Sequence, residues 1–215
     1  MSRSIVIAID GPAASGKSTV ARRLADELGF TYVNTGTMYR AITWQFLEEN
    51  LPMDEASIVN RIQSIPFEVW IDGGHVEMRI AGVDPVEYTR EQRVNGFVPK
   101  VATVPEVREI LTEKMRSLAK HSHLVMEGRD IGSVVFPQTP YKFFIDADEE
   151  IRNKRRKAQG EIDEIQSRDK IDSSRKSAPL QVAQGAVRID TTPMTVDQVM
   201  EAIYSELPKM GLVLV

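Results

Sequence analysis

The chemistry in this sequence is concentrated first in a glycine-rich loop near its start. Gly11-Pro12-Ala13-Ala14-Ser15-Gly16-Lys17-Ser18 matches the pattern G-x-x-x-x-G-K-[ST], and Thr19 follows it. The apolar run 5–9 precedes the loop, and the segment 17–28 has helical periodicity. A strand that breaks into such a loop and then a helix leaves several N–H groups facing one concavity, which suits a polyphosphate. This context argues against a chance turn.

The residue types in the loop assign roles toward ATP and Mg²⁺. Main-chain N–H groups hold the phosphates, Lys17 neutralises the β and γ groups, and the Ser18 hydroxyl ligates Mg²⁺. A loop of this kind serves GTPases, motors and small-molecule kinases alike. No N-K-x-D tetrapeptide occurs, which argues against a GTPase, and 215 residues leave little room for a motor's coupling machinery. The residues expected to bind ATP are Gly11, Pro12, Ala13, Ala14, Ser15, Gly16, Lys17, Ser18 and Thr19.

Two further stretches place polar groups after apolar strands. "VNTGTMYRAI" offers the hydroxyls of Thr35 and Tyr39 and the guanidinium of Arg40, a set suited to a second phosphate. Taken alone, this stretch is better explained as an ordinary helix cap with a surface arginine. "LVMEGRDIGSVVFP" ends an apolar strand in Glu127-Gly128-Arg129-Asp130. Charged residues crowded against a buried strand end indicate a binding site.

The surrounding elements predict one α/β domain. Apolar, β-rich runs alternate with segments of helical period, which is the pattern of a parallel sheet covered by helices. The predicted strands are 5–9, 31–33, 123–126, 141–145 and 186–189, and the clearest helices are 17–28, 105–119 and 196–207. We therefore expect a P-loop NTPase-type, doubly wound, five-stranded parallel sheet with helices on both faces.

Two regions interrupt this alternation. Residues 67–82 alternate apolar and polar side chains around Asp72-Gly73-Gly74, which predicts an inserted antiparallel hairpin. The stretch "EEIRNKRRKAQGEIDEIQSRDK" is charged and helix-prone, with almost no apolar face from Arg152 to Glu161. We expect this second region to form a short charged lid that can swing.

Composition excludes several other classes of site. The chain has no cysteine, so disulfides and thiolate metal sites are impossible, and His75, His121 and His123 lack partner ligands for a metal cluster. A formal net charge of −4 gives no general attraction to nucleic acid or anionic membranes. No apolar run approaches the roughly 20 residues of a membrane span, and a core strand begins within five residues of the start. We expect a cytoplasmic protein.

Seven stretches together resemble the bacterial cytidylate (CMP) kinases of the nucleoside monophosphate kinase family. They are "IDGPAASGKST", "NTGTMYRA", "VPEVREIL", "EGRDIGSVVFP", "KFFIDADEEIRNKRR", "SRDKIDSSRKSAPL" and "VRIDTT". Their order and spacing cover nearly the whole chain. The resemblance implies transfer of the γ-phosphoryl group of ATP to CMP or dCMP with Mg²⁺, by a monomer. It also implies that the hairpin belongs to an enlarged monophosphate-binding insert.

The resemblance further implies roles for individual side chains. The residues expected to bind the acceptor phosphate are Thr35, Arg40, Arg129 and Arg175, with Tyr39 beside them. Arg108 and Asp130 resemble the cytosine readers, Arg168 and Asp172 resemble the pair that reaches the ribose, and Glu127 joins Ser18 near the metal. The residues expected to assist the transfer are Lys17, Arg129, Arg175 and the lid residues Arg152 and Arg156, with Arg155 between them. Pro99 stands where the family commonly has a serine that helps hold the base.

This interpretation predicts a single kinase domain in three parts. The core comprises about 1–36, 101–148 and 178–215, the monophosphate-binding insert about 37–100, and the lid about 149–177.

Two alternatives remain open at the level of the sequence. The basic run 152–157 could belong to a nucleic-acid-binding protein with a P-loop switch. Against that, the run is short, is followed by Glu161, Asp163 and Glu164, and has no interleaved aromatic residues to stack on bases. The second alternative is a kinase for another small acceptor, such as UMP or shikimate.

Overall fold

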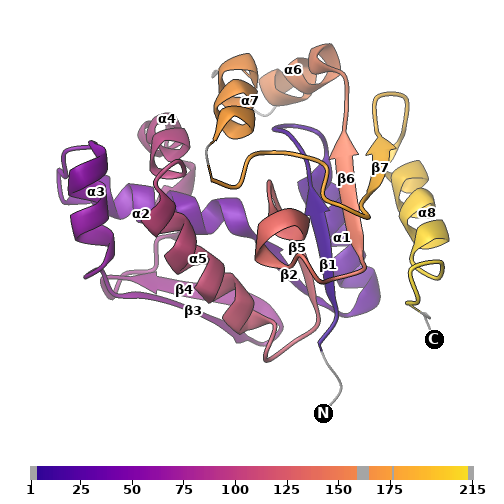
Figure 1. The fold of residues 1–215 in the computed structure, drawn as a ribbon, viewed down its shortest axis with the longest axis horizontal. Helices are drawn as coiled ribbons and strands as arrows, with labels where there is room; N and C mark the ends of the chain where they lie inside the picture. The colour runs from indigo at the N-terminus through magenta and orange to yellow at the C-terminus, as the bar shows by residue number, and fades with distance from the viewer. Residues whose placement is uncertain (1–3, 159–164, 176, 213–215) are drawn as a thin grey trace. The chain divides into compact units, whose positions relative to one another are not determined.

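A computed structural model describes residues 4–158, 165–175 and 177–212 (Figure 1). The chain divides into two compact units, Met1–Val33 with His123–Val215 and Asn34–Ser122, and each is described by itself. The predicted insert, 37–100, falls in the second unit, which also includes 101–122. The division into core, insert and lid remains a prediction.

The first unit is organised around a five-stranded parallel sheet. Its strands are β1 (Val6–Asp10), β2 (Thr31–Asn34), β5 (Leu124–Gly128), β6 (Lys142–Asp146) and β7 (Val187–Asp190). Their order is β2-β5-β1-β6-β7, and β1 runs parallel to both of its neighbours. All five predicted strands are confirmed, with bounds shifted by one or two residues. The predicted fold class is also confirmed.

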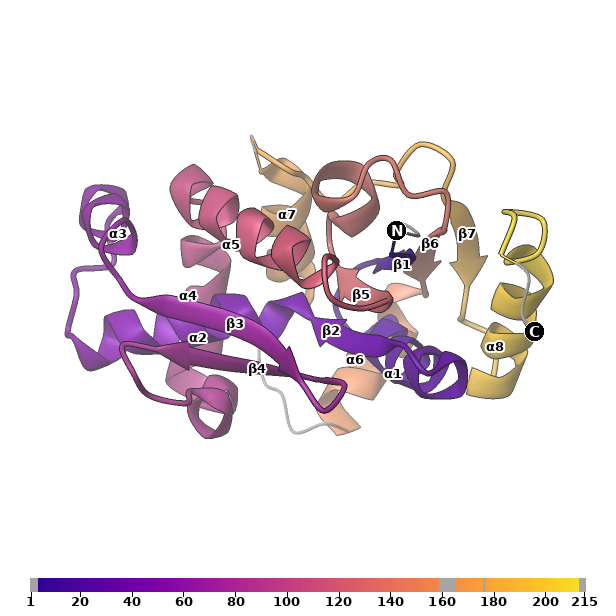
Figure 2. The ribbon, with the colours of Figure 1, turned by 90° about the horizontal axis from the view of Figure 1, so that it is seen from below.

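The helices of this unit are α1 (Lys17–Leu28), α6 (Glu149–Ala158), α7 (Ile165–Ser174) and α8 (Val196–Glu206), with the π-helical turn η2 (Ile131–Val135). Apolar side chains of α1 and α8 pack on those of β1, β5, β6 and β7 to form the buried core. Figure 2 shows α1 and α8 on one face of the sheet and the segment with η2 on the other. The carboxyl ends of the strands thus lead into the loops that carry the predicted site residues.

Local sequence explains where α1 and α8 begin and end. Helix α1 ends at Gly29, which is left-handed at φ 66° and donates its N–H to carbonyls of the last turn. Helix α8 begins with a capping box in which Thr195 and Gln198 exchange side-chain and main-chain hydrogen bonds. In the part of the chain that the structure describes, no helix is long and apolar enough to cross a membrane.

The second unit contains the predicted hairpin and five helical segments. These are α2 (Thr35–Glu48), α3 (Glu55–Ile62), η1 (Val86–Arg90), α4 (Gln92–Val101) and α5 (Pro105–Leu118). Strands β3 (Phe67–Asp72) and β4 (His75–Ile80) pair antiparallel, as predicted. Gly73 and Gly74 both have positive φ, which a two-residue hairpin turn of this kind requires. Pro99 lies inside α4.

Candidate active site

The glycine-rich segment, 11–19, forms a tight turn between β1 and α1, and we call it the donor loop. A Cβ on Gly11 would lie 2.0 Å from the carbonyl oxygen of Ile145, so only glycine fits there. The buried Lys17 Nζ donates to the Pro12 carbonyl at 2.9 Å. Burial, together with the nearby positive charge of Arg129, lowers the pKa of Lys17 to about 7. A bound polyphosphate would add negative charge beside this ammonium and so raise its pKa.

Side chains from two other segments hold the main chain of the donor loop. Thr191, directly after β7, donates its hydroxyl to the Ser15 carbonyl at 2.9 Å. The Arg155 guanidinium donates to the same carbonyl at 3.2 Å and to the Thr191 hydroxyl at 3.1 Å. Arg155 therefore braces the loop. The sequence prediction placed it only in the lid.

A buried carboxylate lies beside the first turn of α1. Ser18 Oγ donates to Glu127 Oε2 at 2.7 Å, and the Tyr32 hydroxyl donates to Glu127 Oε1 at 2.5 Å. The Arg22 guanidinium lies over the Tyr32 ring, with its central carbon 4.8 Å from the ring centroid. The two predicted metal ligands, Ser18 and Glu127, are thus adjacent, and Tyr32 fixes the orientation of the carboxylate.

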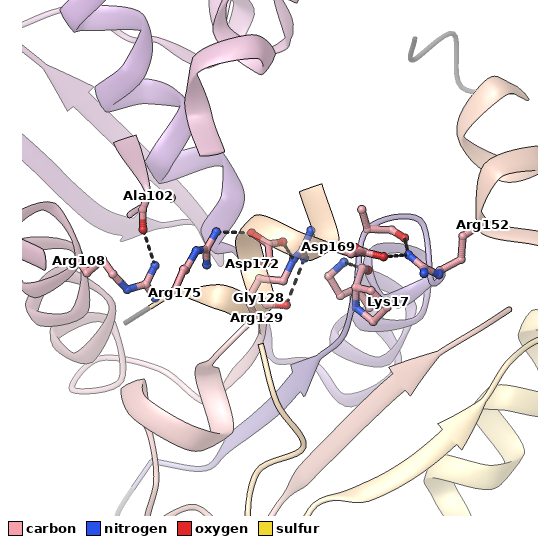
Figure 3. Close-up of polar contacts among 11 residues, drawn as sticks. Lys17, Ala102, Arg108, Gly128, Arg129, Arg152, Asp169, Asp172 and Arg175 are labelled. Carbon is pink, nitrogen blue, oxygen red and sulfur yellow. Dashed lines mark hydrogen bonds and ion pairs between the residues drawn. The ribbon is translucent and has the colours of Figure 1, made fainter. Parts of the chain in front are cut away.

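Asp172 links two of the predicted acceptor arginines, and we call Arg129, Asp172 and Arg175 the arginine cluster (Figure 3). Arg129 Nε donates to Asp172 Oδ2 at 2.8 Å, and Arg175 Nη2 donates to the other carboxylate oxygen. The Asp172 and Arg175 side chains are only 7% and 6% exposed. The cluster holds two cations together through one carboxylate. Arg168, predicted beside them, lies in α7, and its side chain falls outside the described residues.

The lid arginines of α6 are more constrained than their sequence suggests. Arg152 donates to the carbonyls of Ala147 at 2.9 Å and Ala13 at 3.2 Å, and pairs with Asp169 at 2.5 Å (Figure 3). Arg152 and Arg156 are each 7% exposed. The first of them is thus bound to the main chain of the donor loop. Residues 159–164 of the predicted lid lie outside the described part of the chain.

The second unit contains the other predicted acceptor residues. Arg108 is buried, donates to the Ala102 carbonyl at 3.0 Å, and lies 5.5 Å from the centroid of the Tyr39 ring. Arg40 Nε donates to Asn95 Oδ1 at 3.2 Å. Thr35 is buried at the first position of α2. Within this unit, Arg108 and Tyr39 are brought together, and each arginine is oriented by a partner.

Sequence reasoning missed the residues that orient the predicted ones. They are Asp10, Tyr32, Asn95, Ala102, Asp169 and Thr191. Some signal existed, because Asp10 is a charge at the end of an apolar strand and Thr191 lies in "VRIDTT". The carbonyl of Ala102 could not be found in this way, because every residue carries one.

Comparison with known proteins identifies the family. The family model described as cytidylate kinase matches residues 7–209, which spans almost the whole chain and includes both units. The chain belongs to the cytidylate kinase family. A cytidylate kinase from Caldanaerobacter subterraneus is 43% identical over 218 residues, which cover 96% of each chain. One from Clostridium botulinum (strain Loch Maree) is 40% identical over 214 residues, covering 94% of this chain and 97% of its own. The resemblance read from the motifs is confirmed.

A solved structure supports the fold. A gluconokinase from Sinorhizobium meliloti covers 97% of this chain, and 93% of its own, with a TM-score of 0.51 at 10% sequence identity. At that identity the likeness concerns the fold alone. This likeness agrees with the order of helices and strands around the five-stranded parallel sheet.

Proposed function

We propose that this member of the cytidylate kinase family transfers the γ-phosphoryl group of ATP to CMP and dCMP, giving ADP and CDP or dCDP, in pyrimidine nucleotide metabolism. The observation that carries the proposal is the family match over residues 7–209 in a chain whose donor loop opens α1. ATP is the phosphate donor of this family.

On the donor side, the main-chain N–H groups of 11–19 bind the ATP phosphates at the N-terminus of α1. Lys17 gives up its bond to the Pro12 carbonyl and neutralises the β- and γ-phosphates. Its charge is worth most when negative charge builds on the bridging oxygen of the breaking bond. Arg152, which donates to the Ala13 carbonyl, adds positive charge beside the loop, and we assign the same task to Arg156.

Ser18 and Glu127 fit a Mg²⁺ site. Their oxygens already lie 2.7 Å apart, and Mg²⁺ favours hard oxygen ligands, holding few protein groups and keeping substrate phosphates and waters. Among the described residues no cluster of three or more acidic or histidine side chains could hold a metal without substrate. When bound, Mg²⁺ neutralises charge on the transferring phosphate. Tyr32 keeps Glu127 in position for this role.

On the acceptor side, we assign binding of the CMP phosphate mainly to arginines, because planar guanidinium groups match the geometry of phosphate oxygens. The arginines assigned to it are Arg40, Arg129 and Arg175, and Thr35 and Tyr39 are assigned beside them. The assignments for the rest of the acceptor are Arg108 and Asp130 for cytosine, and Arg168 and Asp172 for the ribose.

The transfer needs no strong general base, because the monophosphate oxygen of CMP is already ionised at neutral pH. This oxygen attacks the γ-phosphorus, the bond to the bridging oxygen breaks, and ADP leaves with that electron pair. The chain's contribution is to hold two polyanions together and to exclude water. This is consistent with a site rich in arginine and lysine.

An ADP-release assay with CMP, dCMP, UMP, AMP, GMP and shikimate tests the proposal. CMP and dCMP should give the highest kcat/KM, and ATP hydrolysis without an acceptor should be far slower than transfer, because closure requires both substrates. Preference for another acceptor would contradict it, and ATP hydrolysis stimulated by nucleic acid would favour the alternative of a nucleic-acid-binding protein with a P-loop switch. We further expect a monomer in analytical ultracentrifugation, and a cytoplasmic location in cell fractionation.

A further inference from the structure

Asp10 is a buried carboxylate to which the proposed function gives no role. It is the last residue of β1, precedes the donor loop directly, and is 3% exposed. Its Oδ1 accepts the N–H of Ile131 at 2.8 Å, and its Oδ2 accepts the N–H of Gly132 at 2.8 Å. Both oxygens therefore bind the main chain of a segment more than 100 residues away.

That segment carries two of the proposed acceptor residues. Ile131 and Gly132 begin η2 and follow Arg129 and Asp130 directly. The Asp130 carbonyl accepts the N–H groups of Val134 and Val135, at 2.9 and 3.2 Å, so the turn closes on itself. The turn fixes its own shape, and Asp10 fixes where it lies against β1.

Strand geometry separates Asp10 from the predicted metal site. Ile9 pairs with Glu127 and Asp10 pairs with Gly128 in the parallel β1–β5 register. Because successive side chains of a strand point to opposite faces, Asp10 and Glu127 lie on opposite faces of the sheet. Glu127 faces Ser18 of α1, whereas Asp10 faces η2. Asp10 is therefore not a third metal ligand beside Ser18 and Glu127.

Burial disfavours the ionised form of the Asp10 carboxyl group. Desolvation, with a smaller contribution from the negative charge of Asp130, raises the pKa of Asp10 to about 6, although the two N–H groups and Arg129 act against this. At neutral pH the group is thus mostly ionised, and it accepts two charge-assisted hydrogen bonds, which are stronger than neutral ones.

We propose that Asp10 is a positioning residue that sets the acceptor segment, Arg129 and Asp130, in register with the donor loop, acting through the N–H groups of Ile131 and Gly132. The inference rests on the proposed function, because it takes these two residues to bind CMP. In this role Asp10 acts on CMP through the main chain of its neighbours and not by direct contact. One residue thereby links the parts that must bring acceptor oxygen and γ-phosphorus together, where a misplacement of about 1 Å can cost about a hundredfold in rate.

The test is Asp10→Asn. The amide keeps one acceptor oxygen but turns an NH₂ group toward the second N–H, so one bond is lost and two donors face each other. We expect the KM for CMP to rise by roughly tenfold to a hundredfold and kcat to fall. The Kd for ATP alone, measured by calorimetry, should stay within about twofold because the donor loop keeps its other contacts.

The KM change distinguishes positioning from a loss of stability. A merely structural role would lower Tm and the fraction of active enzyme, but the folded molecules would keep their KM for CMP. Asp54→Asn is the matched control, since Asp54 also accepts a main-chain N–H, from Ser57 at 2.9 Å, at the exposed start of α3. Asp54→Asn should leave the KM for CMP and the KM for ATP unchanged.

A second variant covers the case in which Asp10→Asn does not fold. Asp10→Glu keeps both carboxylate oxygens but displaces them on a longer side chain, and its KM for CMP should exceed that of wild type whether or not Asp10→Asn can be measured. A wild-type KM for CMP in the folded variants would overturn the inference. If wild-type enzyme fails to phosphorylate CMP at all, it is the proposed function that fails, before any variant is compared.

Discussion

The donor loop and the arginine cluster both present positive charge, yet they are built differently. The loop uses main-chain N–H groups and one lysine within nine consecutive residues, with Lys17 bonded only five residues back to Pro12. The cluster uses side chains, and its Arg129–Asp172 pair joins residues 43 apart in sequence. A site made of backbone is encoded by a short motif, whereas a site made of side-chain pairs depends on the finished fold.

Lys17→Met should have the largest effect, because the donor loop has one side-chain cation. We expect kcat to fall by about 10³-fold or more, since the lysine stabilises charge that develops only in the transition state. Steady-state assays at saturating ATP and CMP measure this. Lys209→Met removes an exposed lysine paired with Glu206 and should change kcat by less than twofold. A near-normal rate in Lys17→Met would contradict the assignment of the loop.

Asp172→Asn probes the arginine cluster without substrate. Removing a buried carboxylate breaks the ion pairs that it makes with Arg129 and Arg175, which costs about 3 kcal/mol. For a chain of this size the melting temperature should drop by roughly 6–12 °C. The matched control is Arg188→Ala, which breaks a pair with Asp146 whose arginine is 65% exposed and should cost less than about 1 kcal/mol. Equal shifts would mean that the cluster contributes no more than a surface pair.

Asp130→Ala tests whether a single side chain on the acceptor side distinguishes cytosine from uracil. A carboxylate accepts from the 4-amino group of cytosine but faces an acceptor oxygen in uracil, and Arg108 adds a donor that suits cytosine. Wild type should prefer CMP to UMP by about 10²-fold in kcat/KM. Asp130→Ala should lose most of this preference, because its kcat/KM for CMP should fall more than its kcat/KM for UMP. Asp84→Ala, in an exposed loop, is the control. An unchanged CMP:UMP ratio in Asp130→Ala would show that Asp130 does not read the base.

The smallest expected effect is the uptake of a proton by Lys17 when ATP binds. Because the pKa of Lys17 is about 7 in the free protein, most molecules carry a neutral amine at pH 8. ATP raises this pKa, so binding at pH 8 should take up close to one proton, whereas binding at pH 6 should take up almost none from this group. Calorimetry in buffers of different ionisation enthalpy measures the difference. Lys17→Arg should abolish the uptake at pH 8, since arginine is always charged. If Lys17→Arg took up as many protons as wild type, Lys17 would not be the group that is protonated when ATP binds.

The sequence predicted the centre of the sheet well because β1, β5 and β6 are short, largely apolar runs whose residues are buried on both faces. It also predicted α1 to the residue, since Lys17 opens it after a glycine and Gly29 closes it. It did not resolve α4, where Gly96 and Pro99 interrupt the helical pattern, or η2, whose "IGSVV" follows a strand without a cap. These elements form through tertiary contacts, which periodicity does not reveal.

For the site, the sequence identified residue types but not their partners. Through the resemblance it assigned Arg129 and Arg175 to the acceptor phosphate and Asp172 to the ribose, but it did not predict the ion pairs that join the three side chains. It gave no sign that Arg152 and Arg156 would be buried, because the partners of Arg152 include the carbonyls of Ala13 and Ala147, which leave no mark in a sequence. Burial of charge depends on such main-chain acceptors.

The hairpin turn has a practical consequence for observing this molecule. A side chain at Gly73 or Gly74 would meet nothing within 4 Å, and the neighbouring His75 is exposed. The chain contains no cysteine, so thiols introduced at His75 and at the exposed Glu201 of α8 would be its only two. A dye on each would report, by energy transfer between single molecules, the separation of the two units as ATP and CMP are added.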